Sequence, residues 1–152
     1  MTPAVRLLER EGVPHVLHPY EPGPGSYGTA GAAALGVEPE RMLKTLLADL
    51  DGRLVCAVVP VSGSLDLKAL AMLLGGKRAV MAEPAAAERS SGYVVGGISP
   101  LGQKAPLRTG IDETAELHAT VHVSAGRRGL SVELAPADLV RLTGALVGDL
   151  AR

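Results

Sequence analysis

Two neighbouring residues, Lys44 and Thr45, place a positive charge beside a hydroxyl at the start of an apolar run. They follow a predicted turn, so the lysine begins a strand. A lysine ammonium at such a position can meet a phosphate or a carboxylate as a compact point charge. A solvated strand end is an equally good interpretation of the pattern taken alone.

A second segment, residues 92–104, is rich in glycine and proline and contains the pair Gly96-Gly97. Paired glycines let the backbone approach a ligand closely, and successive N–H groups of such a turn can form an anion-binding nest. A nest of this kind would stabilise the oxyanion that develops during ester hydrolysis. The alternative interpretation is a tight turn that joins two elements.

A third segment, residues 123–129, is a turn of small residues that carries Ser124, Arg127 and Arg128. Its arginines are placed to hold a phosphate or a ribose. A polar hairpin tip is the alternative interpretation of this pattern.

The sequence predicts neither a nucleophilic cysteine nor a metal site formed by histidines. Cys56 lies in the middle of an apolar strand, where a cysteine is typically a small buried hydrophobe. His118 and His122 are predicted to lie about 13 Å apart on one strand, with no cysteine or carboxylate cluster beside them, so we expect no metal site. His15 and His18 face opposite sides of their strand and are expected at the surface. An enzyme of this composition must rely on backbone groups, a lone cation or its own substrate.

The composition limits the class of protein. The chain has 152 residues, which favours one domain over residues 1–152, and its single cysteine cannot form an internal disulfide. We expect a cytoplasmic protein, because no segment has the pattern of a signal peptide or a membrane span. The formal net charge of −1 argues against a general DNA or polyanion binder, but it allows a local patch to hold the end of a nucleic acid.

The predicted helices and strands that position these residues do not follow a regular βαβ order. We therefore predict an α+β fold, with a mixed and partly barrel-like sheet surrounded by helices. Asp51-Gly52 between two apolar runs predicts a β-hairpin. The predicted helices cover residues 3–11, 32–35, 38–42, 66–74, 84–89 and 136–150, and the predicted strands 13–20, 44–50, 53–60, 79–81, 118–124 and 129–134; residues 21–31 and 93–104 are predicted as loops.

Taken together, these segments resemble the YbaK family, which is related to the editing domain inserted in bacterial prolyl-tRNA synthetases. The resemblance covers nearly the whole chain, and its most specific part is the combination of Lys44-Thr45 with residues 96–104. It also includes residues 1–5, 18–20, 65–68, 89–93 and 123–134.

The resemblance implies an aminoacyl-tRNA deacylase that removes cysteine from mischarged tRNA(Pro) without any cofactor. Under it, the catalytic groups are Lys44 and the backbone of Gly96 or Gly97. The implied tRNA-contacting residues are Lys104, Arg127 and Arg128, and the substrate-binding residues are Tyr20, Tyr27, Thr45, Ile98, Ser99, Ser124 and Ser131. It further implies substrate assistance, in which the substrate's thiol attacks its own carbonyl or the ribose 2′-hydroxyl orients a water.

One departure concerns specificity, because Ser131 stands where cysteine-specific members commonly carry Asp, whereas Thr45 favours the cysteine-specific branch. Deacylation of Ala-tRNA(Pro) or of a broader set of aminoacyl-tRNAs is therefore an alternative. A non-catalytic module that binds tRNA or a synthetase is another, and a hydrolase of free amino-acid esters is a third. The expected partners are the acceptor end of tRNA(Pro) and prolyl-tRNA synthetase.

Overall fold

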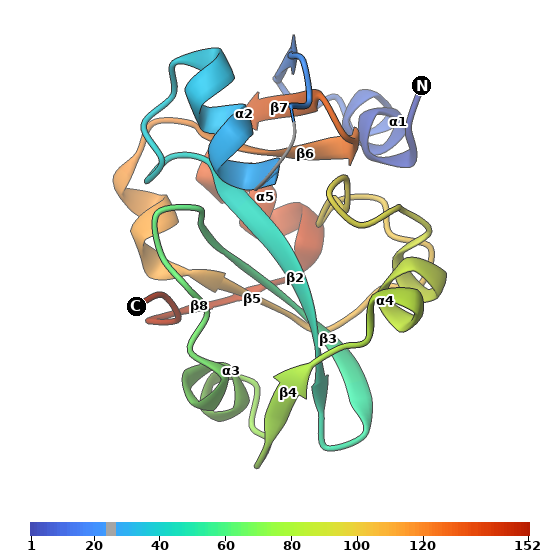
Figure 1. The fold of residues 1–152 in the computed structure, drawn as a ribbon, viewed down its shortest axis with the longest axis vertical. Helices are drawn as coiled ribbons and strands as arrows, with labels where there is room; N and C mark the ends of the chain where they lie inside the picture. The colour runs from blue at the N-terminus through green and yellow to red at the C-terminus, as the bar shows by residue number, and fades with distance from the viewer. Residues whose placement is uncertain (24–26) are drawn as a thin grey trace.

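The computed structural model describes residues 1–23 and 27–152, apart from the side chains of residues 27 and 28. Within this part of the chain, helices surround two β-sheets (Figure 1). The helices are α1 (Pro3–Arg10), α2 (Tyr27–Leu35), α3 (Leu67–Leu73), α4 (Pro84–Ser91), the 3-10 helix η1 (Glu113–Leu117) and α5 (Pro136–Thr143). The strands are β1 (Val16–Pro19), β2 (Leu43–Leu50), β3 (Arg53–Pro60), β4 (Ala79–Met81), β5 (Thr109–Asp112), β6 (Val121–Arg127), β7 (Leu130–Leu134) and β8 (Leu146–Gly148).

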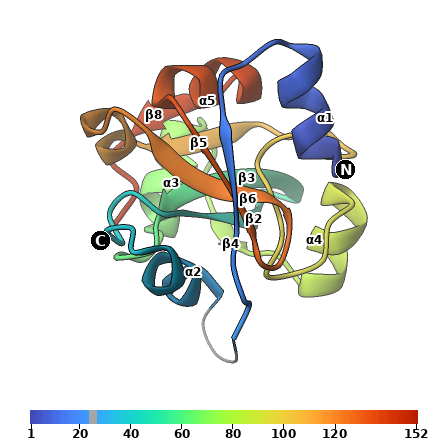
Figure 2. The ribbon, with the colours of Figure 1, turned by 90° about the horizontal axis from the view of Figure 1, so that it is seen from above.

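The two sheets meet at the start of β2. One sheet is antiparallel with the order β1-β7-β6, and the other is mixed with the order β4-β2-β3-β5-β8. A β-bridge pairs Met42 with His122, and the His122 N–H donates to the carbonyl of Arg41. Because β6 lies against β2 in this way, the two sheets curl into a partial barrel, as the views in Figures 1 and 2 show. The predicted α+β class is confirmed.

The long hairpin β2–β3 is formed at the predicted turn. Asp51 and Gly52 both have positive φ, 52° and 90°, as a two-residue turn of the favoured hand requires. The Asp51 carboxylate also accepts hydrogen bonds from the backbone N–H groups of Lys77 and Arg78. This register places Lys44 opposite Val59, at the end of the hairpin remote from the turn.

Alternate residues of β2 enter two different hydrophobic cores. Leu43 and Leu47 join the core that contains α1, β6 and β7, whereas Ala48 and Leu50 join the core beneath α3. Side chains alternate across a strand, so Thr45 belongs to the face of Leu43 and Leu47. The strand is therefore buried on both faces, and its beginning lies beside β6.

Three predicted elements differ from the structure. Residues 38–42 form a turn and a bridge instead of a helix, and α2 begins at Tyr27, inside the predicted loop. The predicted helix 136–150 ends at Thr143, because Gly144 takes the left-handed conformation with φ 63°. The residues that follow form β8, which pairs in parallel with β5, a strand that the sequence pattern did not indicate.

The helices found in the described ranges are all too short or too polar to cross a lipid bilayer.

Candidate active site

A pocket of about 320 Å³ opens between β2, the β6–β7 hairpin and the glycine-rich segment after α4. Most of its lining is aliphatic, with a few polar groups among the apolar ones. The residues that line it are Tyr20, Met42, Leu43, Lys44, Thr45, Leu46, Leu47, Met81, Ala82, Pro84, Ala87, Val95, Gly96, Ile98, Ser124, Leu130 and Ser131. A small concave site with an apolar wall and few polar groups is typical of small-molecule recognition.

Seven of the predicted site residues meet in this one pocket although they come from distant parts of the sequence. They are Tyr20, Lys44, Thr45, Gly96, Ile98, Ser124 and Ser131. The partial barrel explains their convergence, because β2 and β6 lie side by side and β7 pairs with β6. Predicted residues that do not line the pocket are Gly97, Ser99, Lys104, Arg127 and Arg128. The Tyr27 side chain lies outside the described residues.

Lys44 and Thr45 bring unused polar groups to the pocket. No acidic side chain of the described residues lies within ion-pair distance of Lys44. The Thr45 hydroxyl oxygen is buried, and no hydrogen-bond partner is found for it in the described part of the chain. A buried polar group without a partner costs about 1–3 kcal/mol, and this one belongs to a residue that lines the pocket.

Gly97 has a structural role that differs from the predicted one. Its N–H donates to the carbonyl of Val94 at 2.9 Å, so this N–H is not free to hold an oxyanion. The Ser124 hydroxyl donates to the Gly97 carbonyl at 3.0 Å. A Cβ at position 97 would lie 2.8 Å from backbone atoms of Arg127, which leaves room for glycine alone. Gly97 therefore lets the loop contact the β6–β7 hairpin.

Gly96 lines the pocket from the same loop, with a φ of 91° that favours glycine. Its backbone N–H has no hydrogen-bond partner among the residues that the structure describes. Of the two glycines, only Gly97 uses its N–H in a hydrogen bond to another described residue.

Two charged side chains hold this loop from opposite directions. The Arg128 guanidinium donates through Nε and Nη2 to the carbonyl of Val95, at 3.0 and 2.8 Å. The Val95 N–H donates to the Glu88 carboxylate at 2.8 Å. Arg128 thus positions the backbone next to Gly96, whereas Arg127 and Lys104 are exposed outside the pocket lining.

The predicted contact of Ser99 with the substrate is not supported, because its side chain is fully buried. Its hydroxyl oxygen accepts a hydrogen bond from the Leu101 N–H at 3.2 Å, which closes a turn of the segment after α4. Its hydrogen bond is local, and its predicted site role came from the family resemblance.

Cys56 is buried in β3, as predicted. Burial raises the pKa of its thiol to about 12, although a weak hydrogen bond from Gln103 acts in the opposite direction. A thiol that stays protonated inside an apolar core is not a nucleophile.

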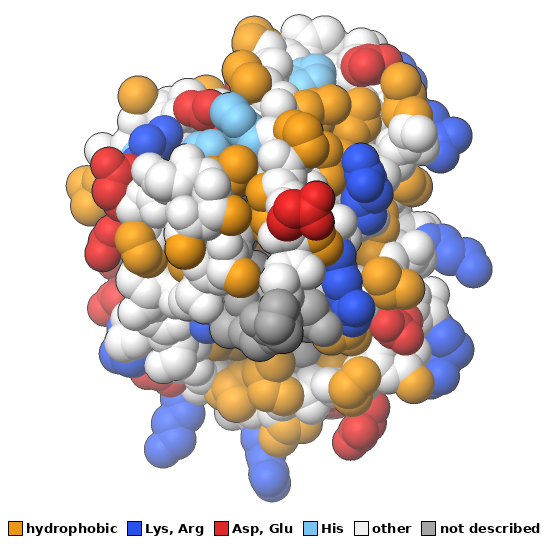
Figure 3. All heavy atoms as spheres, turned by 45° about the horizontal axis from the view of Figure 1, so that its top comes forward, with side chains coloured by type: hydrophobic (Ala, Val, Ile, Leu, Met, Phe, Trp, Pro, Cys, Tyr) orange, Lys and Arg blue, Asp and Glu red, His pale blue; other side chains and the backbone are white. Residues whose placement is uncertain are grey.

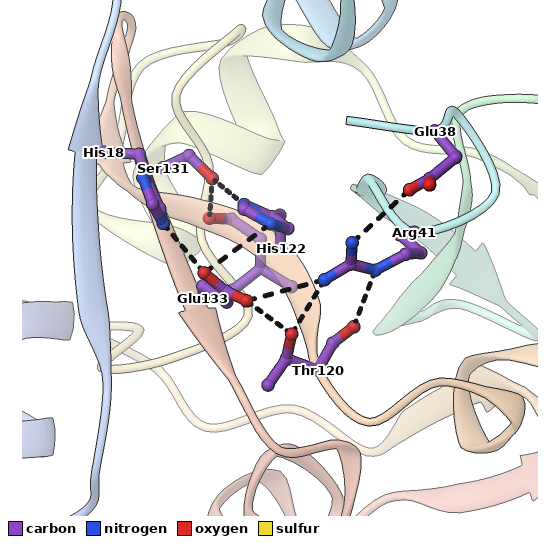
Figure 4. Close-up of polar contacts among 8 residues, drawn as sticks. His18, Glu38, Arg41, Thr120, His122, Ser131 and Glu133 are labelled. Atoms are coloured by element: carbon purple, nitrogen blue, oxygen red, sulfur yellow. Dashed lines mark hydrogen bonds and ion pairs between the residues drawn. The ribbon is translucent and has the colours of Figure 1, made fainter. Parts of the chain in front are cut away.

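A polar cluster behind the pocket was missed at the level of sequence. His18 of β1, His122 of β6 and Glu133 of β7 come together on one face of the antiparallel sheet (Figure 4). His18 Nε2 lies 2.9 Å from a Glu133 oxygen, and His122 Nδ1 lies 3.3 Å from the Ser131 hydroxyl. Ser131 therefore connects the cluster to the pocket wall.

The cross-strand register explains this cluster and corrects the expected isolation of His122. His122 and Glu133 are directly paired across the β6–β7 hairpin, so a carboxylate does stand beside the histidine. Burial lowers the pKa of His122, and the nearby Glu133 charge acts in the opposite direction. Hydrogen bonds from Thr120 and His18 lower the pKa of Glu133. Pairing residues outward from the predicted turn at 125–128 would not have placed His122 opposite Glu133, because a β-bulge between Ser124 and Arg127 shifts the register.

Comparison with known proteins decides the family. The family model described as the aminoacyl-tRNA editing domain matches residues 26–142. The chain belongs to the YbaK/EbsC family of aminoacyl-tRNA editing domains. The matched range includes all the pocket-lining residues except Tyr20.

Relatives agree with membership of the YbaK/EbsC family. A protein of Enterococcus faecalis, EbsC, is named as a proposed Cys-tRNA(Pro)/Cys-tRNA(Cys) deacylase; it is 36% identical over 145 residues, covering 93% of this chain and 88% of the relative. A proline–tRNA ligase of Moorella thermoacetica is 35% identical over 74 residues, which are 48% of this chain and 13% of the ligase.

Solved structures agree with the YbaK/EbsC fold. A crystal structure described as a proposed trans-editing enzyme for prolyl-tRNA synthetase has a TM-score of 0.84 and 26% identity, covering 100% of this chain and 99% of the other. The structure of the hypothetical protein APE2540 has a TM-score of 0.89 and 24% identity, covering 99% of this chain and 100% of the other. The two proteins therefore share a fold.

Proposed function

We propose that this editing domain hydrolyses the ester of cysteinyl-tRNA(Pro) in trans, with the substrate supplying the nucleophile. The observation that carries the proposal is the Lys44 ammonium in a small, mainly aliphatic pocket, without an ion-pair partner among the described residues and next to a Thr45 hydroxyl that has no hydrogen-bond partner among them. The name of the Enterococcus faecalis relative supports a cysteinyl ester as the substrate. The ligase relative supports a connection with proline decoding.

In the proposed complex, the 3′ end of the tRNA enters the pocket with its esterified amino acid. Lys44 binds the terminal phosphate or a ribose oxygen, a charge-assisted contact worth about 1.5–3 kcal/mol. The Gly96 N–H donates to the oxyanion of the tetrahedral intermediate. Thr45 and Tyr20 contact the amino acid, and the aliphatic wall excludes water.

The substrate thiol carries out the proposed attack. Its sulfur forms a bond to the ester carbonyl carbon, the bond from that carbon to the ribose oxygen breaks, and the thiol proton ends on the ribose hydroxyl. Water then opens the cyclic thioester. Because the reacting group is already attached, orientation alone lowers the barrier by several kcal/mol, on the order of the effects seen for intramolecular reactions. The buried state of Cys56 is consistent with a substrate-borne nucleophile.

A second candidate substrate is alanyl-tRNA(Pro), and Ser131 in the pocket wall is the observation that favours it. Ser131 leaves this wall neutral, so nothing at this position selects for a thiol over a methyl group by charge. Alanine carries no thiol, so its removal requires the ribose 2′-hydroxyl to orient a water.

The test compares single-turnover deacylation of cysteinyl-, serinyl- and alanyl-tRNA(Pro) by the purified protein. We expect the cysteinyl ester to be cleaved at least tenfold faster than the serinyl ester, because sulfur is the better nucleophile of an otherwise isosteric pair. Equal rates for these two esters would contradict thiol attack. A faster alanyl reaction would transfer the assignment to the second candidate, and no cleavage of any ester would favour a binding module.

A further inference from the structure

The cluster of His18, His122 and Glu133 brings three potential metal ligands together outside the substrate pocket. Their nearest donor atoms all lie within 4.8 Å of one another. Each donor comes from a different strand of one sheet, so the paired backbones hold their relative positions. Two histidines and one glutamate are a donor set known for zinc.

The separations suit one ion bound between the three side chains. A Glu133 oxygen lies 2.9 Å from His18 Nε2 and 4.0 Å from His122 Nε2. In a tetrahedral zinc site, ligand bonds of about 2.0–2.2 Å place neighbouring donor atoms about 3.3 Å apart. These two distances lie on either side of that value, and all three donor atoms fall within 4.8 Å of one another, so the shifts needed to reach it are small.

The neighbouring groups orient the ligands as the outer shell of a metal site does. The Ser131 hydroxyl lies 3.3 Å from His122 Nδ1 and can accept its proton, which leaves the Nε2 lone pair toward Glu133. Thr120 and Arg41 hold the other Glu133 oxygen, at 2.5 and 3.4 Å (Figure 4). Such partners fix the tautomer of a ligating histidine and the rotation of a ligating carboxylate.

Charge and access also favour a cation. The Arg41 guanidinium is shared with Glu38 at 3.3 Å, which offsets its positive charge and leaves the charge of Glu133 for an ion. His122 is 3% exposed, but His18 and Glu133 are 31% and 25% exposed and give an ion a path from solvent. Histidine side chains reach the surface beside acidic and basic ones in the upper part of Figure 3.

We propose that His18, His122 and Glu133 form a binding site for one divalent transition-metal ion of the zinc class. The ion takes the place of the proton that His18 shares with Glu133, and solvent completes its coordination. The proposal is independent of the substrate proposed above, since none of the three ligands lines the pocket.

The test titrates tag-free, metal-free protein with Zn²⁺ by calorimetry and with Co²⁺ by visible absorption. We expect one equivalent to bind, with a Co²⁺ spectrum of a four-coordinate site. His18→Asn and Glu133→Gln should each weaken the affinity at least tenfold, whereas His118→Ala, which removes a histidine outside the cluster, should leave it unchanged. His122→Ala should do the same as the ligand variants, with circular dichroism to confirm that the buried position tolerates alanine.

The proposal is overturned if the wild-type protein binds neither ion more tightly than the His18→Asn variant does. It is also overturned if His118→Ala weakens binding as much as the cluster variants. His18 is partly exposed, so its replacement tests the site even if the His122 variant does not fold.

Discussion

Among the pocket residues, Thr45 gives the most direct indication of a bound ligand. Its hydroxyl is buried beside Lys44 and finds no partner among the described residues, although buried hydroxyls are normally hydrogen-bonded. A substrate group that bonds to this hydroxyl would complete its hydrogen bonding during each reaction cycle.

The replacement Thr45→Val tests this interpretation, because valine keeps the branched shape and removes only the hydroxyl. We expect the free energy of unfolding to stay the same or rise slightly, since no protein hydrogen bond is lost. The value of kcat/KM for cysteinyl-tRNA(Pro) should fall about 5- to 10-fold, as for a net hydrogen bond of about 1–1.5 kcal/mol. Unchanged kinetics would mean that the hydroxyl meets no substrate group.

Several site residues were predictable from the sequence, and their neighbours were not. Lys44 and Thr45 stood out because a cation and a hydroxyl begin an apolar strand. Gly97 and Ser99 are near Gly96 in the sequence but are held by Val94, Ser124 and Leu101. The contact of Gly97 with Ser124 is long-range, so local sequence patterns do not contain it.

At the level of elements, the loop that carries Gly96 depends on its contact with the β6–β7 hairpin. Gly97 forms that contact at a distance that no Cβ permits. Gly97→Ala should therefore destabilise the protein by about 1–3 kcal/mol, as in other overpacked sites, and lower deacylation by displacing Gly96.

Gly23→Ala is the matched control for this change, because no atom of the described residues beyond its chain neighbours lies within 4 Å of a Cβ at that position. Chemical denaturation should show a stability equal to the wild type or slightly higher for the control. Equal loss of stability in both variants would remove the argument that close approach selects glycine at position 97.

Asp112, at the end of β5, forms hydrogen bonds that hold the C-terminal residues in place. Its carboxylate accepts from the N–H groups of Leu150, Ala151 and Thr114, at 2.8, 2.9 and 3.1 Å. Burial by itself raises the pKa of this carboxyl, but the hydrogen bonds, first that of the Thr114 hydroxyl, outweigh it and keep the pKa below its ordinary value.

A depressed pKa means that the folded state favours the charged carboxylate. This stabilisation is complete above the unfolded pKa of about 3.9 and is lost as the pH falls through the lower folded value. Asp112→Asn should cost about 1.5–3 kcal/mol at neutral pH and flatten the acid limb of the stability curve. Asp149 forms an exposed ion pair with Arg152, so Asp149→Asn should change little in either the stability at neutral pH or the acid limb. An acid limb in Asp112→Asn as steep as that of the wild type would contradict this role of Asp112.

The elements that the sequence pattern missed share a physical cause. The helix predicted over residues 136–150 has a continuous leucine stripe, but Gly144 ends it and the next residues pair with β5. Both β5 and β8 have few residues, and each owes its strand form to a parallel neighbour. Alternation in a segment of three or four residues carries too little signal to reveal such pairing, whereas the hairpin at Asp51-Gly52 is encoded locally.

For the molecule as a whole, the net charge of −1 limits how strongly it can attract tRNA. Acidic and basic side chains are interspersed over the described part of the face in Figure 3. We therefore expect binding of tRNA(Pro) to rest on a few basic groups: Lys44, Lys104, Arg127 and Arg128.

Four phosphate contacts predict a slope of about −3 in a plot of log affinity against log salt concentration for a single-stranded end. Arg127→Ala should make that slope about 0.7 unit shallower, whereas Lys77→Ala, beside the turn of the β2–β3 hairpin, should leave it unchanged. Filter binding across salt concentrations measures both. A slope near zero would show that contacts other than ion pairs hold the tRNA.

The most direct measurement of the central claim is single-turnover deacylation of cysteinyl-tRNA(Pro) by the wild-type protein, by Lys44→Ala and by Lys68→Ala. Lys68 is an exposed lysine of α3 and controls for the loss of a positive charge. Loss of a charge-assisted contact of about 1.5–3 kcal/mol predicts a rate roughly 10- to 100-fold lower for Lys44→Ala. The Lys68→Ala rate should equal that of the wild type. Equal rates for all three proteins would contradict the claim that the pocket around Lys44 is the site of ester hydrolysis.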